Sequence, residues 1–318
     1  MTTASAPGKI ILFGEHAVVS GATALGGAID LRASVSVQDR PGGVVVSTDD
    51  LMLKGFSLDL QSGRLFSSQA THAVRYISAV LREFGAHDVE VRIDSSLPAS
   101  AGLGSSAAIV VAAVLAISSH QGSSLSLKEI AALSFRLERE VQEGLASPTD
   151  TALATYGGYL KISSQISPLD LPPLDLVVGY TGVPHSTRSE VEKVQKLKKK
   201  YPELIDGIFQ AIGTISDRAQ PLMVDQNKAE LGELMNINHG LLEAIGVGSR
   251  ELCELVYASR GAGEAMGAKI TGAGGGGCMI AIPGPTGEEP LITAIRQAGG
   301  RPFATTMGQE GVRLEMEA

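Results

Sequence analysis

The sequence predicts a protein of mixed α and β structure that folds as two packed units. The chain has 318 residues, whereas a single hydrophobic core rarely grows past about 250–300 residues. Alternating and β-branched runs dominate the first third, and longer stretches with helical spacing of apolar residues follow. Residues 163–173 contain three prolines and few large apolar side chains, which is typical of a linker. We therefore expect one unit at residues 1–168 and a second at residues 169–318.

The composition indicates a globular protein from a reducing compartment. Hydrophobic residues make up 44% of the chain and charged residues 19%, which is ordinary for a globular protein. The net charge of -8 argues against a general nucleic-acid binder, because phosphate contacts come mostly from Lys and Arg. Only Cys253 and Cys278 are present, too few for a disulfide framework. The longest apolar run, residues 107–117, is too short to span a bilayer. We expect a cytoplasmic protein with no membrane segment.

The first third of the chain is expected to be largely sheet. Residues 5–19 are predicted to form a strand broken by a turn at Pro7-Gly8, because both residue types favour turns. Apolar side chains at helical spacing predict a helix over residues 71–84. The other strands expected in this part lie at residues 28–38, 43–47 and 89–93.

Helices are expected to dominate the rest of the chain. Residues 109–117 are apolar on every side, which predicts a buried helix. Amphipathic helices are expected at residues 127–144, 189–201, 204–215, 228–245, 250–266 and 290–298. Strands are expected at residues 159–162 and 174–180, in a glycine hairpin across residues 267–282, and in two short segments at the end of the chain. The six histidines form no close pair with metal-ligand spacing.

A loop of small residues at 98–108 precedes the buried helix and is the first candidate for function. Gly102 and Gly104 allow positive φ and a close approach of a ligand to the backbone. Ser105 and Ser106 lie where the helix begins, beside amides without an intrahelical partner, and such a helix start suits phosphate. A loop that only permits tight packing fits this stretch equally well. The candidate phosphate-binding residues are Pro98, Ala101, Gly102, Leu103, Gly104, Ser105, Ser106, Ala107 and Ala108.

Two common nucleotide-binding motifs do not fit this loop. The pattern Gly102-x-Gly104-x-x-Ala107 needs a strand directly before it and an acid about 20 residues later to be a dinucleotide fingerprint. Residues 94–98 intervene after the strand, and no acid lies near Ser123-Ser124. The Gly-x-x-x-x-Gly-Lys-Ser/Thr pattern is absent from the whole chain.

Three features far apart in the chain together resemble the GHMP small-molecule kinases, named for galactose, homoserine, mevalonate and phosphomevalonate. They are Pro7-Gly8-Lys9 with Gly14-Glu15-His16, the loop at 98–108, and residues 271–277. Their order and spacing match across nearly the whole chain. Residues 14–21, Ser147-Pro148-Thr149-Asp150 and residues 269–278 resemble the branch of this family that phosphorylates mevalonate. A galactose-specific member would carry an acidic-aromatic pair where this chain has Ala17-Val18.

The resemblance implies a fold and an activity. The fold would be α+β, with an N-terminal domain like ribosomal protein S5 domain 2 and a ferredoxin-like C-terminal domain. ATP and (R)-mevalonate would bind between them, and the C5 hydroxyl would be phosphorylated, as a step of isoprenoid precursor synthesis. The small-molecule substrate would be the main partner; a homodimer is compatible with the family, but the sequence does not fix the oligomeric state. A sister kinase for phosphomevalonate or homoserine, and an inactive ligand sensor, are the alternatives.

The resemblance also implies roles for single residues. Asp150 would take the proton from the substrate hydroxyl, and Lys9 would favour the resulting alkoxide; an aspartate that caps the following helix is the alternative for Asp150. Ser106 would bind Mg²⁺ together with Glu138, although Glu140 competes, because helical periodicity does not separate the two glutamates. The residues implied to face the substrate are Glu15, His16, Thr181, Arg188, Gly274 and Gly275. His16 could equally be a buried core histidine.

Overall fold

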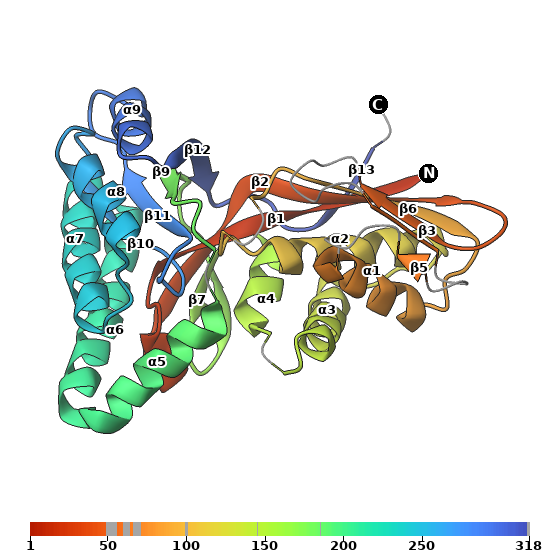
Figure 1. Ribbon diagram of the computed structural model, residues 1–318, viewed down its shortest axis with the longest axis horizontal. Helices are drawn as coiled ribbons and strands as arrows, with labels where there is room; N and C mark the ends of the chain where they lie inside the picture. Colours follow the sequence, from red (N-terminus) through yellow and green to blue (C-terminus); the bar gives the residue numbers. More distant parts are fainter. Residues whose placement is uncertain are drawn as a thin grey trace.

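The computed structural model describes residues 1–48, 56–59, 64–65, 71–98, 101–144, 146–184 and 186–316. Its strands form one hydrogen-bonded network that extends through both halves of the chain (Figure 1). The N-terminal strands are β1 (Thr2–Phe13), β2 (Ala24–Asp39), β3 (Val45–Thr48), β4 (Phe56–Asp59), β5 (Arg64–Leu65), β6 (Val89–Ser95), β7 (Tyr159–Ile162) and β8 (Ile166–Leu169). The C-terminal strands are β9 (Leu174–Tyr180), β10 (Gly267–Ile270), β11 (Cys278–Ile282), β12 (Arg301–Met307) and β13 (Arg313–Glu315).

Strands β1 and β2 form the long antiparallel pair on which both halves are built. The turn expected at Pro7-Gly8 is wrong, because β1 continues from Thr2 to Phe13 and only shifts its register between Pro7 and Lys9. Such a shift bends a strand without ending it. Gly8 permits close packing there, since a Cβ on it would lie 2.3 Å from Leu97 Cδ2.

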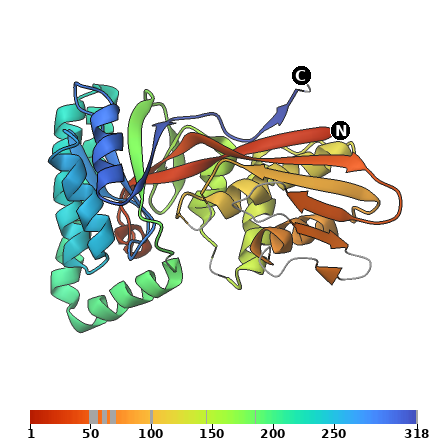
Figure 2. The ribbon, with the colours of Figure 1, turned by 45° about the horizontal axis from the view of Figure 1, so that its top comes forward.

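Four helices cover one face of the N-terminal strands (Figures 1 and 2). They are α1 (Thr71–Glu83), α2 (Ser105–His120), α3 (Leu127–Val141) and α4 (Pro148–Tyr156). Helix α2 is buried along nearly its whole length, from Ala107 to Ala116 apart from the half-buried Leu115. This confirms the buried helix expected from its all-apolar sequence. Helix α2 packs against β1, β2, α1 and α3, so its first turn has a fixed position at the edge of this layer.

A group of helices lies beside β9, β10, β11 and β12 in the C-terminal half (Figure 1). The helices are α5 (Thr187–Lys200), α6 (Pro202–Val224), α7 (Lys228–Ala244), α8 (Arg250–Arg260) and α9 (Glu289–Gln297). Two sequence-based expectations are corrected here. The first helix begins at Thr187, because Ser186 caps it by accepting a hydrogen bond from Ser189 N. The predicted linker at 163–173 contains β8, which pairs with β7.

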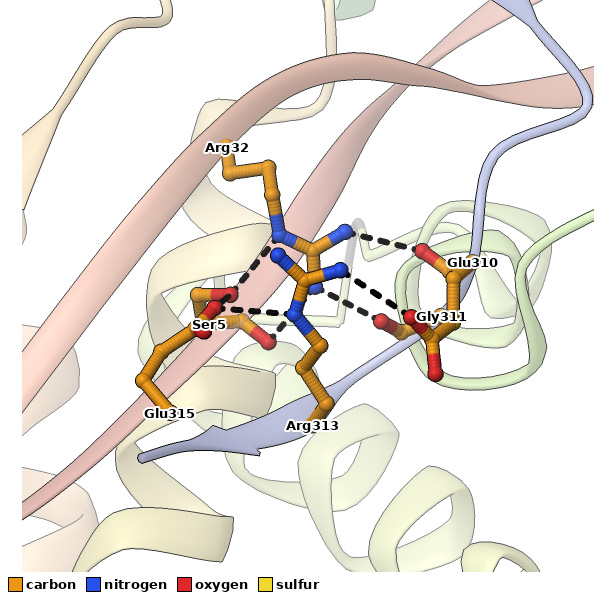
Figure 3. Close-up of polar contacts among 6 residues, drawn as sticks. All are labelled: Ser5, Arg32, Glu310, Gly311, Arg313 and Glu315. Atoms are coloured by element: carbon orange, nitrogen blue, oxygen red, sulfur yellow. Dashed lines mark hydrogen bonds and ion pairs between the residues drawn. The ribbon is translucent and has the colours of Figure 1, made fainter. Parts of the chain in front are cut away.

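The end of the chain returns to the N-terminal sheet. Strand β12 pairs with β9 and β2, and β13 pairs with β1, so the two termini lie at the same end of the molecule (Figure 2). Arg32 on β2 binds the segment between β12 and β13. Its guanidinium donates to Glu310 O at 2.9 Å and Gly311 O at 2.7 Å of that segment, and to Ser5 O of β1 at 3.0 Å (Figure 3). Arg313 lies beside it and donates to Glu310 and Glu315.

Buried apolar side chains form the core, and the largest cluster extends from the N-terminal strands and α1–α3 into β9, β11, α6 and α7. Among the described residues, none of the helices combines the length and apolar character needed to cross a bilayer.

Candidate active site

Lys9 and the small-residue loop are built as one unit. The backbone N–H of Lys9 donates to Leu103 O at 2.9 Å, which joins β1 to the loop. Gly104 has φ +77°, and a Cβ on it would lie 2.8 Å from Lys9 Cγ. The glycine is therefore required both by its left-handed backbone and by the lysine side chain that passes over it. Ala99 and Ser100, within the predicted loop, lie outside the described residues.

The loop delivers the first turn of α2 to the same place. Gly104 is the N-cap, and no side chain caps the helix, so the first amides have no acceptor within the helix. Ser105 and Ser106 lie half-buried in this turn, whereas Ala107 and Ala108 are buried and anchor it. Of the other loop residues, Ala101 and Leu103 are buried, Gly102 is exposed and Pro98 is half-buried. The arrangement can bind an anion at the helix start.

Ser106 contacts a buried glutamate on α3. Its Oγ donates to Glu138 Oε1 at 2.7 Å, and Gln142 Nε2 donates to the same oxygen at 2.9 Å. Glu138 Oε2 is buried and has no hydrogen-bond partner in the part of the chain that the structure describes. Burial, reinforced by the negative charge of Asp150, raises the pKa of Glu138 to about 7. An unsatisfied buried carboxylate oxygen beside a serine hydroxyl fits a hard cation such as Mg²⁺.

Glu140, the competing glutamate, lies on the surface. Its carboxylate is 53% exposed and pairs with Arg82 on α1 at 2.5 Å. The structure therefore brings Glu138, and not Glu140, to Ser106. Sequence periodicity could not make this choice, because both residues flank the apolar stripe of α3.

Asp150 lies opposite Lys9 at the start of α4. Its Oδ2 is 3.4 Å from Lys9 Nζ, and the two side chains are 26% and 10% exposed. The helix begins at Pro148 with Ser147 as N-cap, so Asp150 lies in the first turn and is not the cap that the alternative interpretation required. A carboxylate in the first turn interacts favourably with the helix dipole, and the proline fixes the turn that holds it.

Glu15 does not lie open to solvent. Its carboxylate is 1% exposed and forms an ion pair with the fully buried Lys269 of β10. Burial raises the pKa of the Glu15 carboxyl and lowers that of the Lys269 ammonium, while their mutual attraction opposes both shifts. Lys269 Nζ also donates to Ile270 O at 2.7 Å, and Asn238 Nδ2 lies 3.5 Å from Glu15 Oε2. The pair joins the first and third sequence motifs.

His16 makes the second connection between these motifs. Its Nε2 lies 2.9 Å from Ala273 O, and the residue is 7% exposed. Its backbone has φ 61° and ψ -43°, a conformation that non-glycine residues seldom adopt and that costs about 1–3 kcal/mol. Burial lowers the pKa of His16, so the imidazole is neutral near pH 7. The strained turn directs the ring towards the glycine hairpin.

The other residues predicted to face the substrate have structural contacts of their own. Thr181 Oγ1 donates to Gly277 O at 3.0 Å. Gly274 packs against Val247, whose O would be 2.3 Å from a Cβ, and Gly275 N donates to the same oxygen at 2.8 Å. Arg188 is on the surface of α5 and pairs with Glu192 at 2.9 Å. Within the part of the chain that the structure describes, the side-chain contact of Arg188 is with Glu192 and not with Lys9 or Asp150.

Three partners of the site were not predicted from the sequence. Lys269 and Asn238 contact Glu15, and Gln142 contacts Glu138. The signal for Lys269 was present, because it is a lone charge in an otherwise apolar strand within the third motif. Asn238 and Gln142 carry no such signal, since polar residues are common on helix faces.

The complete arrangement combines a lysine–carboxylate pair, an anion-binding helix start and a buried oxygen pair for a cation. This combination suits transfer of a phosphoryl group to a hydroxyl, a reaction that needs mainly positioning and charge stabilisation. Family models match both halves of the chain: "GHMP kinases N terminal domain" at residues 71–158 and "GHMP kinases C terminal" at residues 219–301. The class defined by fold and site is thus that of the GHMP kinases.

Full-length relatives narrow the class. The chain is 41% identical to the mevalonate kinase of Pyrococcus horikoshii, over 98% of this chain and 97% of the relative, and 36% identical to that of Saccharolobus solfataricus, over 98% of each. Among solved structures, L. major mevalonate kinase in complex with R-mevalonate has a TM-score of 0.83 at 26% identity and covers 96% of each chain. The Methanococcus jannaschii mevalonate kinase has a TM-score of 0.83 at 30% identity, over 96% of this chain and 98% of that one. The chain belongs to the mevalonate kinase family.

Proposed function

We propose that this protein transfers the γ-phosphoryl group of ATP to the C5 hydroxyl of (R)-mevalonate, giving 5-phosphomevalonate and ADP for isoprenoid synthesis. The observation that carries the proposal is the Lys9–Asp150 pair at 3.4 Å, on elements that also hold the first turn of α2. The substrate itself is supported by the relatives, which are named mevalonate kinases over nearly their full length.

Asp150 is the proposed base. At 3.4 Å from Lys9 Nζ its carboxylate is not fully engaged, since charge-assisted N–H···O bonds are typically about 2.7–2.9 Å long. It can therefore accept the proton of a hydroxyl placed beside it, and that oxygen then attacks the γ-phosphorus while the β–γ bridging oxygen leaves with ADP. Lys9 stabilises the negative charge that develops on the attacking oxygen.

The loop and α2 are proposed to bind the phosphates of ATP. The unpaired amides of the first turn and the hydroxyl of Ser105 offer donors to anionic oxygens. Ser106 and Glu138 are the residues that would hold Mg²⁺, which when bound supplies positive charge to the transferring phosphate. Their oxygen-only donor set, with Glu138 buried and Ser106 half-buried, fits that ion.

Substrate-binding roles for the remaining predicted residues belong to the same proposal. His16, Thr181, Gly274 and Gly275 lie on segments that contact one another around the glycine hairpin. Glu15 would act on the substrate indirectly, by holding His16 through the pair with Lys269. Arg188 would meet the carboxylate of mevalonate as an exposed cation.

The proposal has three further parts: a division into two units between residues 168 and 169, a cytoplasmic location and a homodimer. The two family matches lie on either side of the division, and Cys253 and Cys278 are both free thiols, as in proteins from reducing compartments. Light scattering on the purified protein measures its mass in solution. The mass of a monomer would contradict the proposed homodimer.

A substrate panel tests the proposed activity. Mevalonate, phosphomevalonate, homoserine and galactose are each supplied with ATP and Mg²⁺, and ADP release is measured. We expect turnover with mevalonate far above the others. Turnover of homoserine or phosphomevalonate without mevalonate would assign a sister activity, and ligand binding without any turnover would indicate a sensor.

A further inference from the structure

Three side chains with metal-ligating atoms meet between α7 and α8. His239 and Glu243 lie one turn apart on α7, and Cys253 comes from α8. One ligand atom from each lies within 4.8 Å of the others. His239 Nε2 is 3.4 Å from Glu243 Oε2, and Cys253 Sγ is 3.2 Å from Glu243 Oε1. The cluster shares no residue with the proposed phosphoryl-transfer site.

The two ring nitrogens of His239 make no hydrogen bond within the described chain. Its side chain is 1% exposed, yet neither Nδ1 nor Nε2 has a hydrogen-bond partner there. A buried polar group left unsatisfied costs about 1–3 kcal/mol. In a neutral imidazole, one of these two unpartnered nitrogens carries a lone pair that a metal can bind. A buried neutral histidine that faces a carboxylate and a thiol is a ligand set for a transition metal.

The ligand atoms lie near the spacing that tetrahedral zinc requires. Bonds of about 2.0–2.1 Å to nitrogen and oxygen and about 2.3 Å to sulfur place neighbouring ligand atoms roughly 3.3–3.6 Å apart. His239 Nε2 and Cys253 Sγ lie 3.4 Å and 3.2 Å from the two different oxygens of Glu243, and one ligand atom from each residue lies within 4.8 Å of the others, so a small inward movement would bring the ligand atoms into that range. One carboxylate and one thiolate also balance the charge of Zn²⁺, so the occupied site would be neutral.

The surroundings leave room for access and limit competing contacts. Glu243 is 33% exposed, which provides a route from solvent. Gly248, in the loop between the helices, lies close over the cluster, because a Cβ on it would be 3.1 Å from Cys253 Sγ. The guanidinium of Arg260 lies near the cluster and is oriented by its hydrogen bond to Ala268 O at 2.6 Å. Tyr257 donates weakly to Glu243 Oε2 at 3.4 Å and can give way to a metal.

We propose that His239, Glu243 and Cys253 bind a zinc ion, with water as the fourth ligand, and that this ion cross-links α7 and α8. The Cys253 thiol donates to Glu243 Oε1 in the metal-free protein, so zinc binding releases this proton to the buffer as the zinc–sulfur bond forms. No electron is transferred. Sequence spacing did not reveal the site, because its single histidine pairs with a glutamate and its thiol comes from the next helix.

Cobalt substitution tests the site independently of catalysis. Metal-free full-length protein, kept reduced with a phosphine, is titrated with Co²⁺ and then with Zn²⁺. We expect a thiolate-to-cobalt charge-transfer band that saturates at one equivalent and disappears as Zn²⁺ displaces Co²⁺. Because Ser106 and Glu138 offer only oxygen, a metal bound there cannot produce this band.

Three variants decide the assignment. Cys253→Ser, at a half-buried position, should abolish the band. Glu243→Gln removes a direct ligand and should therefore weaken Zn²⁺ binding by more than the roughly 10–100-fold that the loss of an outer-shell partner costs. Cys278→Ala removes the other thiol and should keep the band. Zn²⁺ should also raise the thermal midpoint of the wild type but not of Cys253→Ser. Absence of the band in the wild type, or its persistence in Cys253→Ser, would overturn the proposal and leave the cluster a hydrogen-bonded contact only.

Discussion

The two lysine–carboxylate pairs of this protein differ in how far the protein itself satisfies them. Lys269 and Glu15 are 0% and 1% exposed, and Lys269 has a further hydrogen bond to Ile270 O. Lys9 and Asp150 are 10% and 26% exposed, with their charged atoms 3.4 Å apart. We call Lys269–Glu15 the closed pair, because its charged groups are buried and bonded within the protein. We call Lys9–Asp150 the open pair, because its charged groups keep hydrogen-bonding capacity for a ligand. The difference fits a structural role for the first pair and supports the catalytic role that we propose for the second.

Removing the carboxylate of the open pair is expected to have the largest effect on activity. Asp150→Ala should lower kcat about 10²–10⁴-fold, the usual contribution of a general base. Its cost in stability should stay at or below about 1 kcal/mol, because only a dipole interaction and a partly exposed ion pair are lost. Steady-state ADP release and urea unfolding measure the two quantities.

Asp217→Ala is the matched control, since Asp217 also pairs with a lysine, Lys161 at 2.9 Å, but lies on the surface. Its kcat should equal that of the wild type. Full turnover by Asp150→Ala would remove the assignment of the base.

Removing the lysine of the closed pair should mainly affect stability. Lys269→Met leaves the Glu15 carboxylate buried without its partner, which typically costs about 3–5 kcal/mol. The free energy of unfolding in urea measures this loss. Adding Glu15→Gln removes the unpaired charge and should recover part of it.

Lys161→Met breaks an exposed pair and serves as the control, with an expected cost of about 0–1 kcal/mol. Equal losses in Lys161→Met and Lys269→Met would show that the buried pair has no special structural role.

Alanine substitutions at two glycines distinguish the effect of backbone strain from the effect of displacing the Lys9 side chain. Gly104 and Gly122 have nearly the same φ, +77° and +76°, but only Gly104 has a side chain, Lys9, where a Cβ would be. Alanine at either position should cost about 1–3 kcal/mol through backbone strain. Only Gly104→Ala should also lower kcat, because Lys9 must move. An equal loss of kcat in Gly122→Ala would contradict this coupling.

Arg188 offers the smallest expected effect. Arg188→Ala should change stability by no more than about 0.5 kcal/mol, as expected for an exposed i,i+4 pair. If it binds the substrate carboxylate as proposed, the KM for mevalonate should rise while kcat stays unchanged. Arg250→Ala breaks an equivalent pair with Glu254 on α8 and should leave KM unaltered. An unchanged KM in Arg188→Ala would contradict the proposed contact of Arg188 with the substrate carboxylate.

The same contrast explains what the sequence could predict. Helix α2 and the glycine hairpin were predictable because strong local signals, an all-apolar run and repeated glycines, agree with their surroundings. The turn at Pro7-Gly8 was predicted wrongly, since local propensity indicated a break where pairing with β2 maintains the strand. The predicted linker likewise contains β8, because β7 supplies a partner that no local pattern shows.

The site was predictable to the extent that its residues lie in segments that resemble the family. The proximity of Lys9 and Asp150 was expected from family resemblance, and the structure places their charged atoms 3.4 Å apart. The choice between Glu138 and Glu140 needed the structure, because only the position of α3 against α2 buries one and exposes the other. Lys269 stands out locally as a lone charge in an apolar strand, but no local pattern identifies Glu15, which lies near the other end of the chain, as its partner.

The division of roles between the two pairs is tested most directly by comparing Lys9→Met with Lys269→Met. For both variants, kcat with mevalonate and ATP and the free energy of unfolding are measured under one set of conditions. The account predicts that Lys9→Met loses kcat by about 10²–10³-fold while its stability changes by at most about 1 kcal/mol. Lys269→Met should instead lose about 3–5 kcal/mol of stability, with its folded fraction keeping most of its kcat. A stable, fully active Lys9→Met, or a Lys269→Met as stable as the wild type, would contradict it.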